Sequence, residues 1–519
     1  MSRVNDRSSL RRAARTAIAF LAAGALTLSS VADGLARSMG GGGGGRVMGG
    51  DGMRSPGGGG RYPGNDGPRY PGGGGPRFPG GGGVIVPGGD GSGNGAVIVD
   101  DEDDQGAPRR TKKAKKKNAA KKQKPQQQQI ARRGGFDVPP PGERRFVTNE
   151  VLLNISAATS MPALDAIARR NRLTRLETQD FTLTRRRLAR LRINDGRPVA
   201  TVIRSLQADG RILGAQPNYL YTVQQGGAPS AAADPLQYAL TKLKLPEAHA
   251  IAKGASVLVA VVDTPIDATH PDLADVVVAS FDATDHADKP HAHGTGIASV
   301  IAAHGRLTGA APAVKLLAVH AFGSARSDGT SLNILKGLDW AGKSQARIIN
   351  MSFAGPADEE LHTMLAALRG KGTVLIAAVG NAGPNSKPLY PAADPEVIAV
   401  TATDNNDRLF AQANRGTHIA VAAPGVDILL AAPGGSYQMQ SGTSFAAAQV
   451  SGIAALLLER NPTLDAASIR RLLMSTARDL GAPGHDEQFG SGLANALDAV
   501  TAAGPKSSDV SSSVPAPAN

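Results

Sequence analysis

Ser444 has a sequence setting that suits a nucleophile. It follows Ser441-Gly442-Thr443 and opens an apolar run that predicts a long helix reaching about Glu459. A serine at a helix N-terminus is most often a cap. Here the neighbouring glycine and small residues would let the Ser444 oxygen reach an open cleft. The partial positive charge at the helix start would also favour a developing oxyanion.

His293 could supply the proton transfer that such a nucleophile needs. It lies in His291-Ala292-His293-Gly294-Thr295-Gly296, before a second small and apolar helical stretch. An imidazole accepts and returns a proton near neutral pH. The alternatives are a histidine that starts a helix, or a metal site containing His291 and His293, although no third ligand has convincing spacing.

Asp263 is the carboxylate with the best position to assist that histidine. It directly follows the apolar run Val257–Val262, so we expect it at the carboxyl end of a strand, where functional groups gather in doubly wound sheets. Acids in this position also bind nucleotides or metals or cap helices. Asp267 and Asp272, in the following loop, are competing candidates.

Three segments in a fixed order resemble the signatures of the subtilisin-like serine peptidase family. They are Asp263-Thr264, His293-Gly294-Thr295 and Gly442-Thr443-Ser444-Phe445-Ala446-Ala447. The resemblance covers residues 230–504 and implies a serine endopeptidase that works through an acyl-enzyme. It implies Ser444 as nucleophile, His293 as general base and Asp263 as the carboxylate that orients it.

Asn381 matches the asparagine that lines the family's oxyanion hole, beside the Ser444 N–H. It lies in Ala378-Val379-Gly380-Asn381-Ala382-Gly383, and without the other motifs it would be an ordinary left-handed turn residue. The resemblance also implies substrate-binding residues. An edge segment that pairs with extended substrate contains Ser352, Phe353, Ala354 and Gly355, and the opposite pocket wall contains Ala378 and Gly380.

Several positions depart from the family pattern. Pro265 stands where glycine commonly follows Asp-Thr, and its fixed φ puts the shape of that turn in doubt. Ala354 replaces a common glycine and could narrow the pocket entrance. Ala448 and Gln449 replace a Pro-His pair inside the helix after Ser444. None of these changes removes a catalytic atom.

The elements that must position these residues predict an α/β fold. Between residues 230 and 504, short apolar runs alternate with helical patterns, which is typical of a mostly parallel, doubly wound sheet in a three-layer sandwich. The predicted strands are Val257–Val262, Lys315–Val319, Ile348–Met351, Val374–Ala378 and Val397–Val400.

Residues 143–225 predict a small α+β domain with the ferredoxin-like order β-α-β-β-α-β. Its predicted elements are Glu150–Ile155, Met161–Arg172, Leu176–Leu183, Leu188–Ile193, Pro198–Asp209 and Ile212–Val223. A domain directly before the catalytic one resembles the family's inhibitory propeptide, which implies a self-inhibited precursor cut near Gln225 to Ser230. The alternative is an unrelated accessory domain.

The two ends of the chain lack any core-forming pattern. Residues 1–36 contain five arginines and then an apolar run of about 16 residues, too short for a bilayer span of roughly 20, so we expect a secretory signal and export to the periplasm, cell surface or medium. Residues 37–142 form a Gly/Pro-rich and basic low-complexity arm, and residues 505–519 a tail. We expect both segments to be disordered.

The charge of the chain is concentrated in the arm. The net charge is +13, yet residues 109–133 alone hold twelve Lys or Arg, whereas residues 234–504 hold 19 basic and 25 acidic residues. The catalytic domain therefore gives no support for nucleic-acid binding. The arm is either a solvated spacer or a loose attachment to an anionic surface.

Cysteine is absent, which excludes disulfides and thiolate chemistry. We expect no required cofactor and assign no metal ligands. Structural calcium is common in the family, but the spacing of Asp282, Asp285 and Asp288 specifies no cage. We expect a monomer acting on protein or peptide substrates. Two other hypotheses remain at this point: a non-catalytic peptide-binding protein on the same fold, and a surface-adhesion protein that acts through its basic arm.

Overall fold

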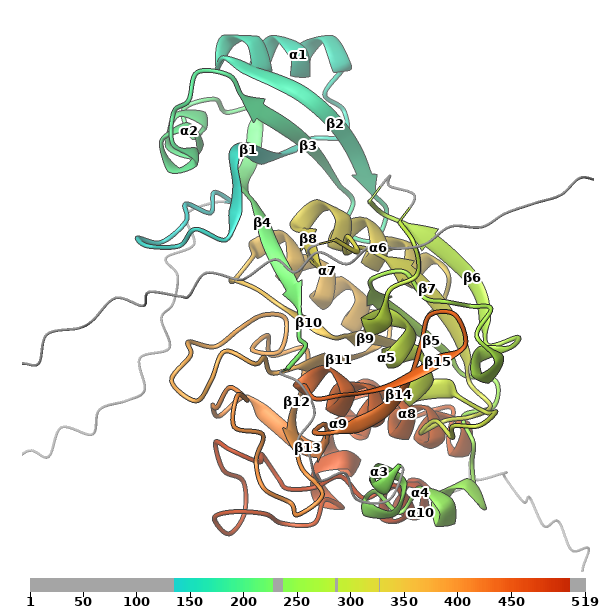
Figure 1. Ribbon diagram of the computed structural model, residues 1–519. Helices are drawn as coiled ribbons and strands as arrows, with labels where there is room; N and C mark the ends of the chain where they lie inside the picture. Colours follow the sequence, from blue (N-terminus) through green and yellow to red (C-terminus); the bar gives the residue numbers. More distant parts are fainter. Residues whose placement is uncertain (1–134, 227–236, 285–287, 326, 505–519) are drawn as a thin grey trace, which may run out of the picture. The chain divides into compact units, whose positions relative to one another are not determined.

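A computed structural model describes residues 135–226, 237–284, 288–325 and 327–504 (Figure 1). The predicted signal, the basic segment 109–133 and the C-terminal tail lie outside these residues. Within the described ranges, no helix combines the length and apolar character needed to cross a membrane.

The small domain has the predicted order of elements. Strands β1, β2, β3 and β4 form an antiparallel sheet in the order β4-β1-β3-β2, and the apolar sides of α1 and α2 cover one face of it. The helix α1 begins where predicted because Ser160 caps it and a proline occupies its first turn. The elements are β1(Phe146–Ile155), α1(Met161–Arg170), β2(Leu173–Phe181), β3(Arg186–Ile193), α2(Val199–Leu206) and β4(Ile212–Val223).

The small domain starts before Glu143, the predicted boundary. Phe136 forms a parallel bridge with Ala215, and the Asp137 N–H donates to the Ala215 carbonyl at 2.9 Å. The Asp137 carboxylate accepts a hydrogen bond from the Tyr219 hydroxyl at 3.0 Å, and burial raises the pKa of Asp137 to about 6. Residues 135–142, assigned to the arm from composition, thus belong to this domain.

The large domain is built on a parallel sheet of seven strands in the order β13-β12-β11-β9-β5-β7-β6. This confirms the predicted α/β architecture and all five predicted strands. Two edge strands were not predicted: β6 is largely exposed, and β13 ends in proline. The strands are β5(Leu258–Asp263), β6(Val277–Asp282), β7(Lys315–His320), β9(Ile348–Met351), β11(Val374–Ala378), β12(Ile398–Thr403) and β13(Ile419–Pro424).

Helices cover both faces of this sheet. Successive side chains of β5 point to opposite faces of the sheet. Val259 and Val261 pack into one apolar cluster, whereas Ala260 and Val262 pack into the other. The first cluster contains α5(Ala292–Ala302), α8(Thr443–Arg460), α9(Ala466–Ser475) and α10(Ala496–Ala503), with the short helices α3(Tyr238–Lys242) and α4(Leu245–His249). The second contains α6(Ser331–Lys343) and α7(Glu359–Gly370).

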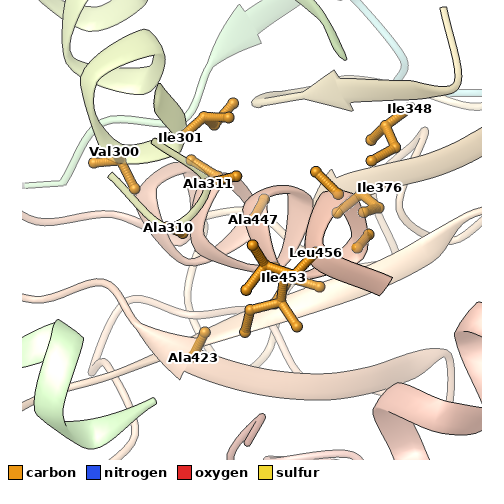
Figure 2. Packing of buried hydrophobic residues seen from close by; sticks show 14 of the residues in the cluster. Val300, Ile301, Ala310, Ala311, Ile348, Ile376, Ala423, Ala447, Ile453 and Leu456 are labelled. Carbon is orange, nitrogen blue, oxygen red and sulfur yellow. The ribbon is translucent and has the colours of Figure 1, made fainter. Parts of the chain in front are cut away.

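The helix α8 lies at the centre of the first cluster. Figure 2 shows Ala447, Ile453 and Leu456 of this helix surrounded by side chains of the sheet and of the segment around α5. Almost all of α8 is buried, from Thr443 to Leu458. A helix that is apolar on all sides suits such a position, and it holds the Ser444 end of α8 rigidly against the sheet.

The order of the strands reverses between β5 and β9. Crevices form at such a switch point, outside the carboxyl ends of the strands. Asp263 is the last residue of β5, and Ser352 directly follows β9. The remaining short elements are η1(Pro271–Leu273), β8(Asp328–Thr330), β10(Phe353–Ala354), β14(Ile428–Ala432) and β15(Ser436–Gln440).

Candidate active site

Asp263 and His293 form a buried pair at this crevice. The distance from His293 Nδ1 to Asp263 Oδ1 is 2.7 Å, and both side chains are fully buried. The same carboxylate oxygen accepts hydrogen bonds from the N–H and hydroxyl of Thr264, at 2.7 and 3.0 Å. Thr264 therefore fixes the carboxylate, which in turn holds a proton on Nδ1 and leaves Nε2 to act as a base.

The neighbouring His291 has a different role. Its Nδ1 accepts the His293 N–H at 3.2 Å and caps the start of α5. Burial, with a smaller contribution from the charge of His293, lowers the pKa of His291. No group of three or more His, Asp or Glu side chains in the described part of the chain is placed to hold a metal.

Ser444 lies in the first turn of α8, beside this pair. The ring of Phe445, the next residue, is 5.8 Å from the His293 ring, centroid to centroid. The Ser444 hydroxyl donates to the carbonyl of Ser352 at 3.0 Å, and His293 Nε2 has no hydrogen-bond partner within the described residues. The structure thus pairs Asp263 with His293 and brings Ser444 near them, with its hydroxyl turned to β9.

Asn381 follows β11, and Thr443 fixes the oxygen of its side-chain amide. Its side-chain oxygen accepts the N–H and the hydroxyl of Thr443, at 3.1 and 2.8 Å. This contact fixes the orientation of the amide, so that its Nδ2 is the free donor. Nδ2 is buried and has no partner among the described residues. A preorganised donor beside the first turn of a helix is suited to stabilise negative charge on oxygen.

The predicted edge segment pairs with the last strand of the small domain. In β4, Thr222 lies opposite Ala354 and Val223 opposite Phe353, and on its other side Tyr221 lies opposite Gly329 of β8 (Figure 1). The resulting three-stranded antiparallel strip is strand addition of the kind expected for an extended substrate. The sequence did not predict the β8 side, whose short Asp-Gly-Thr segment has no apolar pattern.

Gln224, at the end of this strand, reaches the candidate catalytic residues. Its N–H donates to the Ser352 carbonyl at 3.0 Å, the same oxygen that accepts from the Ser444 hydroxyl. Its side-chain oxygen accepts the Asn381 N–H at 2.9 Å. A Cβ added to Gly442 would lie 2.6 Å from the Gln224 carbonyl oxygen and 3.3 Å from Asn381 Nδ2, so glycine is required for this close approach.

The other predicted site residues also line this region. Gly380 donates its N–H to the Thr443 hydroxyl at 3.3 Å, with a φ of 108° that favours glycine, and Ala378 ends the buried strand before it. Pro265 does not disturb the pair of Asp263 and His293, and its carbonyl accepts the His291 N–H at 2.9 Å. Ala448 and Gln449 are buried within α8.

The acidic residues considered for calcium are arranged around an imidazole. Asp282 Oδ1 lies 3.0 Å from His320 Nδ1, and Asp288 Oδ2 lies 3.4 Å from His320 Nε2. An imidazole between two carboxylates does not fit an oxygen cage for calcium. The third candidate, Asp285, lies outside the described residues.

Comparisons with known proteins identify the family of the large domain. The model of the Subtilase family matches residues 254–492. Subtilisin DY of Bacillus licheniformis is 38% identical over 251 residues, which cover 47% of this chain and 90% of that protein. Thermitase of Thermoactinomyces vulgaris is 35% identical over 272 residues, which cover 51% of this chain and 95% of thermitase.

A solved structure has the same fold. Fervidolysin from Fervidobacterium pennivorans, described as a keratinolytic enzyme related to subtilisin, aligns with a TM-score of 0.61 at 23% identity. The match covers 71% of this chain and 62% of that chain, so this chain spans less than two thirds of fervidolysin.

Proposed function

Because this chain belongs to the subtilase family and is a serine endopeptidase, we propose that it is made as a self-inhibited precursor that cleaves its own Gln224–Gln225 bond. One observation carries this proposal. The N–H of Gln224 and the hydroxyl of Ser444 donate to the same oxygen, the carbonyl of Ser352. The bond that follows Gln224 therefore lies next to the proposed nucleophile. This refines the maturation region predicted from the sequence, Gln225 to Ser230.

The proposed chemistry is acyl transfer. Ser444 Oγ turns from Ser352 to His293 Nε2, gives up its proton and attacks the carbonyl carbon of Gln224. Asn381 Nδ2 and the Ser444 N–H bind the oxyanion, and His293 then protonates the departing amine of Gln225. Water, deprotonated by His293, hydrolyses the acyl-enzyme and restores Ser444. Asp263 keeps Nδ1 protonated and stabilises the imidazolium.

The small domain remains an inhibitor after cleavage because its other contacts persist. The Gln216 side chain accepts the Glu360 N–H at 3.2 Å at the start of α7, and Asn218 accepts the Leu332 N–H at 3.4 Å at the start of α6. Arg186 pairs with Glu360 at 2.7 Å. The bonds of Gln216 and Asn218 satisfy N–H groups at two helix N-termini, and the ion pair adds a third contact, so the cleaved domain occupies the cleft as a bound product.

The processing site is the direct test. Purified precursor should yield a fragment whose N-terminal residue is Gln225, identified by intact mass and N-terminal sequencing. The Ser444→Ala precursor should stay uncut, while a Ser475→Ala control, changed at the end of α9, should process normally. A first cut at another bond, or processing of the Ser444→Ala protein without added enzyme, would contradict the proposal.

The role of Asn381 leads to a second expected result. Asn381→Asp keeps the oxygen that accepts from Thr443 but replaces the Nδ2 donor with a charged acceptor. We expect kcat on a peptide substrate to fall by about 10²–10³ or more, a scale known from subtilisin itself, with KM little changed. Steady-state kinetics would measure it. A loss confined to KM would contradict an oxyanion role.

Export is also part of the proposal. The arginine-rich start and the following short apolar run of residues 1–36 support a cleaved signal. The excess of basic residues in 109–133 supports loose retention at an anionic surface. Deleting residues 38–134 should release the protein from such a surface and leave peptidase activity unchanged.

A further inference from the structure

Tyr221 fills a closed pocket of the catalytic domain. It is the fourth residue before the proposed scissile bond, counting Gln224 as the first, and it is fully buried. The ring of Phe353 contacts it edge to face, with centroids 5.9 Å apart and an interplanar angle of 87°. A Cβ added to Gly355 would lie 2.3 Å from a Tyr221 ring carbon, so the glycine makes room for a flat ring.

The end of this pocket is polar. The Tyr221 hydroxyl lies 3.1 Å from the carbonyl oxygen of Pro356 and 3.4 Å from Asp358 Oδ2. Asp358 is buried, and burial raises its pKa, whereas hydrogen bonds from Ser331, Leu361 and Gln216 lower it. A ring without a hydroxyl would take the phenol donor away from both oxygens and leave Asp358 Oδ2 with the Ser331 hydroxyl alone, in a site closed to water, which is costly.

The catalytic domain itself holds Asp358 in this orientation. Ser331 Oγ, at the start of α6, donates to Oδ2 at 2.5 Å, and the Leu361 N–H donates to Oδ1 at 3.0 Å because Asp358 caps α7. Besides the contact of Tyr221 itself, the hydrogen bond from Gln216, at 2.9 Å to Oδ1, leaves with the small domain. The acceptor facing the tyrosine is therefore preorganised in the mature enzyme.

We propose that Asp358 and the Pro356 carbonyl make the mature enzyme select substrates with tyrosine at the fourth position before the scissile bond, in preference to phenylalanine. This inference rests on the proposed function, in which Tyr221 occupies the cleft as a substrate does. Phe353 and Gly355 fit the aromatic ring. The Pro356 carbonyl and Asp358 Oδ2 accept from its hydroxyl.

Peptides that differ only at this position test the inference. The series copies residues 219–226, with Tyr, Phe, Leu or Arg in place of Tyr221, and kcat/KM is measured with the processed enzyme. We expect tyrosine to exceed phenylalanine by about tenfold. Asp358→Ser, which keeps a capping hydroxyl for α7 but is too short to reach the phenol, should reduce this ratio to about twofold.

Asp465→Ser is the matched control, because Asp465 caps α9 through the Ser468 N–H and does not contribute to the cleft. It should keep the tenfold ratio. Equal cleavage of the Tyr and Phe peptides, better cleavage of the Arg peptide, or an unchanged ratio in Asp358→Ser would each overturn the inference while leaving the peptidase mechanism intact.

A second measurement does not depend on catalysis. In the uncut Ser444→Ala precursor, Tyr221→Phe should lower the unfolding midpoint when Asp358 is present and have a smaller effect beside Asp358→Ser. Strictly additive effects would overturn the inference. If no peptide is cleaved at all, the proposed function fails, and this unfolding cycle still decides whether Asp358 recognises the hydroxyl.

Discussion

Replacing Ser444 with alanine is expected to lower kcat for peptide hydrolysis on the order of 10⁶-fold, the loss known for the corresponding change in subtilisin itself. The Ser444 hydroxyl is the proposed nucleophile, and the neighbouring Thr443 hydroxyl already donates to Asn381 Oδ1 at 2.8 Å. Because the Ser444 hydroxyl donates one hydrogen bond, to the Ser352 carbonyl, and alanine suits a helix, the variant should fold normally.

Activity must be measured without the small domain. The Ser444→Ala precursor can be processed by a trace of wild-type enzyme that carries a removable affinity tag, and then assayed with a fluorogenic peptide. Ser475→Ala, treated in the same way, should keep wild-type kcat. Retention of more than about one hundredth of wild-type activity in Ser444→Ala would rule out the proposed acyl-enzyme route.

Replacing Asp263 with alanine is expected to lower kcat by about 10⁴-fold, again a scale known from subtilisin. The carboxylate is fully buried and accepts the Nδ1 proton of His293 at 2.7 Å. Without it the imidazole loses both its orientation and the charge that stabilises its protonated form. Peptide hydrolysis over a range of pH would measure the loss, and an effect below tenfold would contradict the proposed role.

Asp263→Asn should be less damaging than Asp263→Ala. Both donors of Thr264 contact the oxygen that faces His293. They would hold an amide oxygen in the same place, so that the substituted side chain still accepts from Nδ1 and only the negative charge is lost. Equal losses in the two variants would show that Thr264 does not orient this side chain.

The buried sheet was predictable from the sequence because its strands are continuous apolar runs. The five predicted strands of the large domain lie within the sheet, where both faces are covered, so their composition reports their environment. The strand β6 was missed because it lies at the sheet edge and is largely exposed. The pairing of Phe136 with Ala215 was missed because it is an isolated bridge, and the residues around Phe136 are mostly arginine, glycine and proline, which show no strand pattern.

Side-chain partners could be predicted only where a motif specifies them. Asp263 and His293 were paired through such motifs, and the structure brings them together. The separate tasks of His291 and His293 depend on which ring nitrogen faces which backbone group, and spacing carries no such information. Pro265 looked unfavourable because its fixed φ was considered without the His291 N–H that its carbonyl accepts.

Gln224 and Asp358 could not be predicted at all. Each acquires its role from a residue far away in the chain: Gln224 from Ser352 and Asn381, and Asp358 from Tyr221 and Ser331. Locally, Gln224 is one of two adjacent glutamines after a strand, and Asp358 is an ordinary helix cap. Their positions in the cleft come from the packing of two domains, which no local pattern encodes.

Labelling with a fluorophosphonate tests the central claim most directly. The reagent phosphonylates a serine only where a base activates it and donors stabilise the negative charge on oxygen. After processing and removal of the small domain, peptide mapping by mass spectrometry should find one adduct, on Ser444, and His293→Ala should abolish it. An adduct on another serine, or no adduct in an enzyme that still cleaves peptides, would contradict the account.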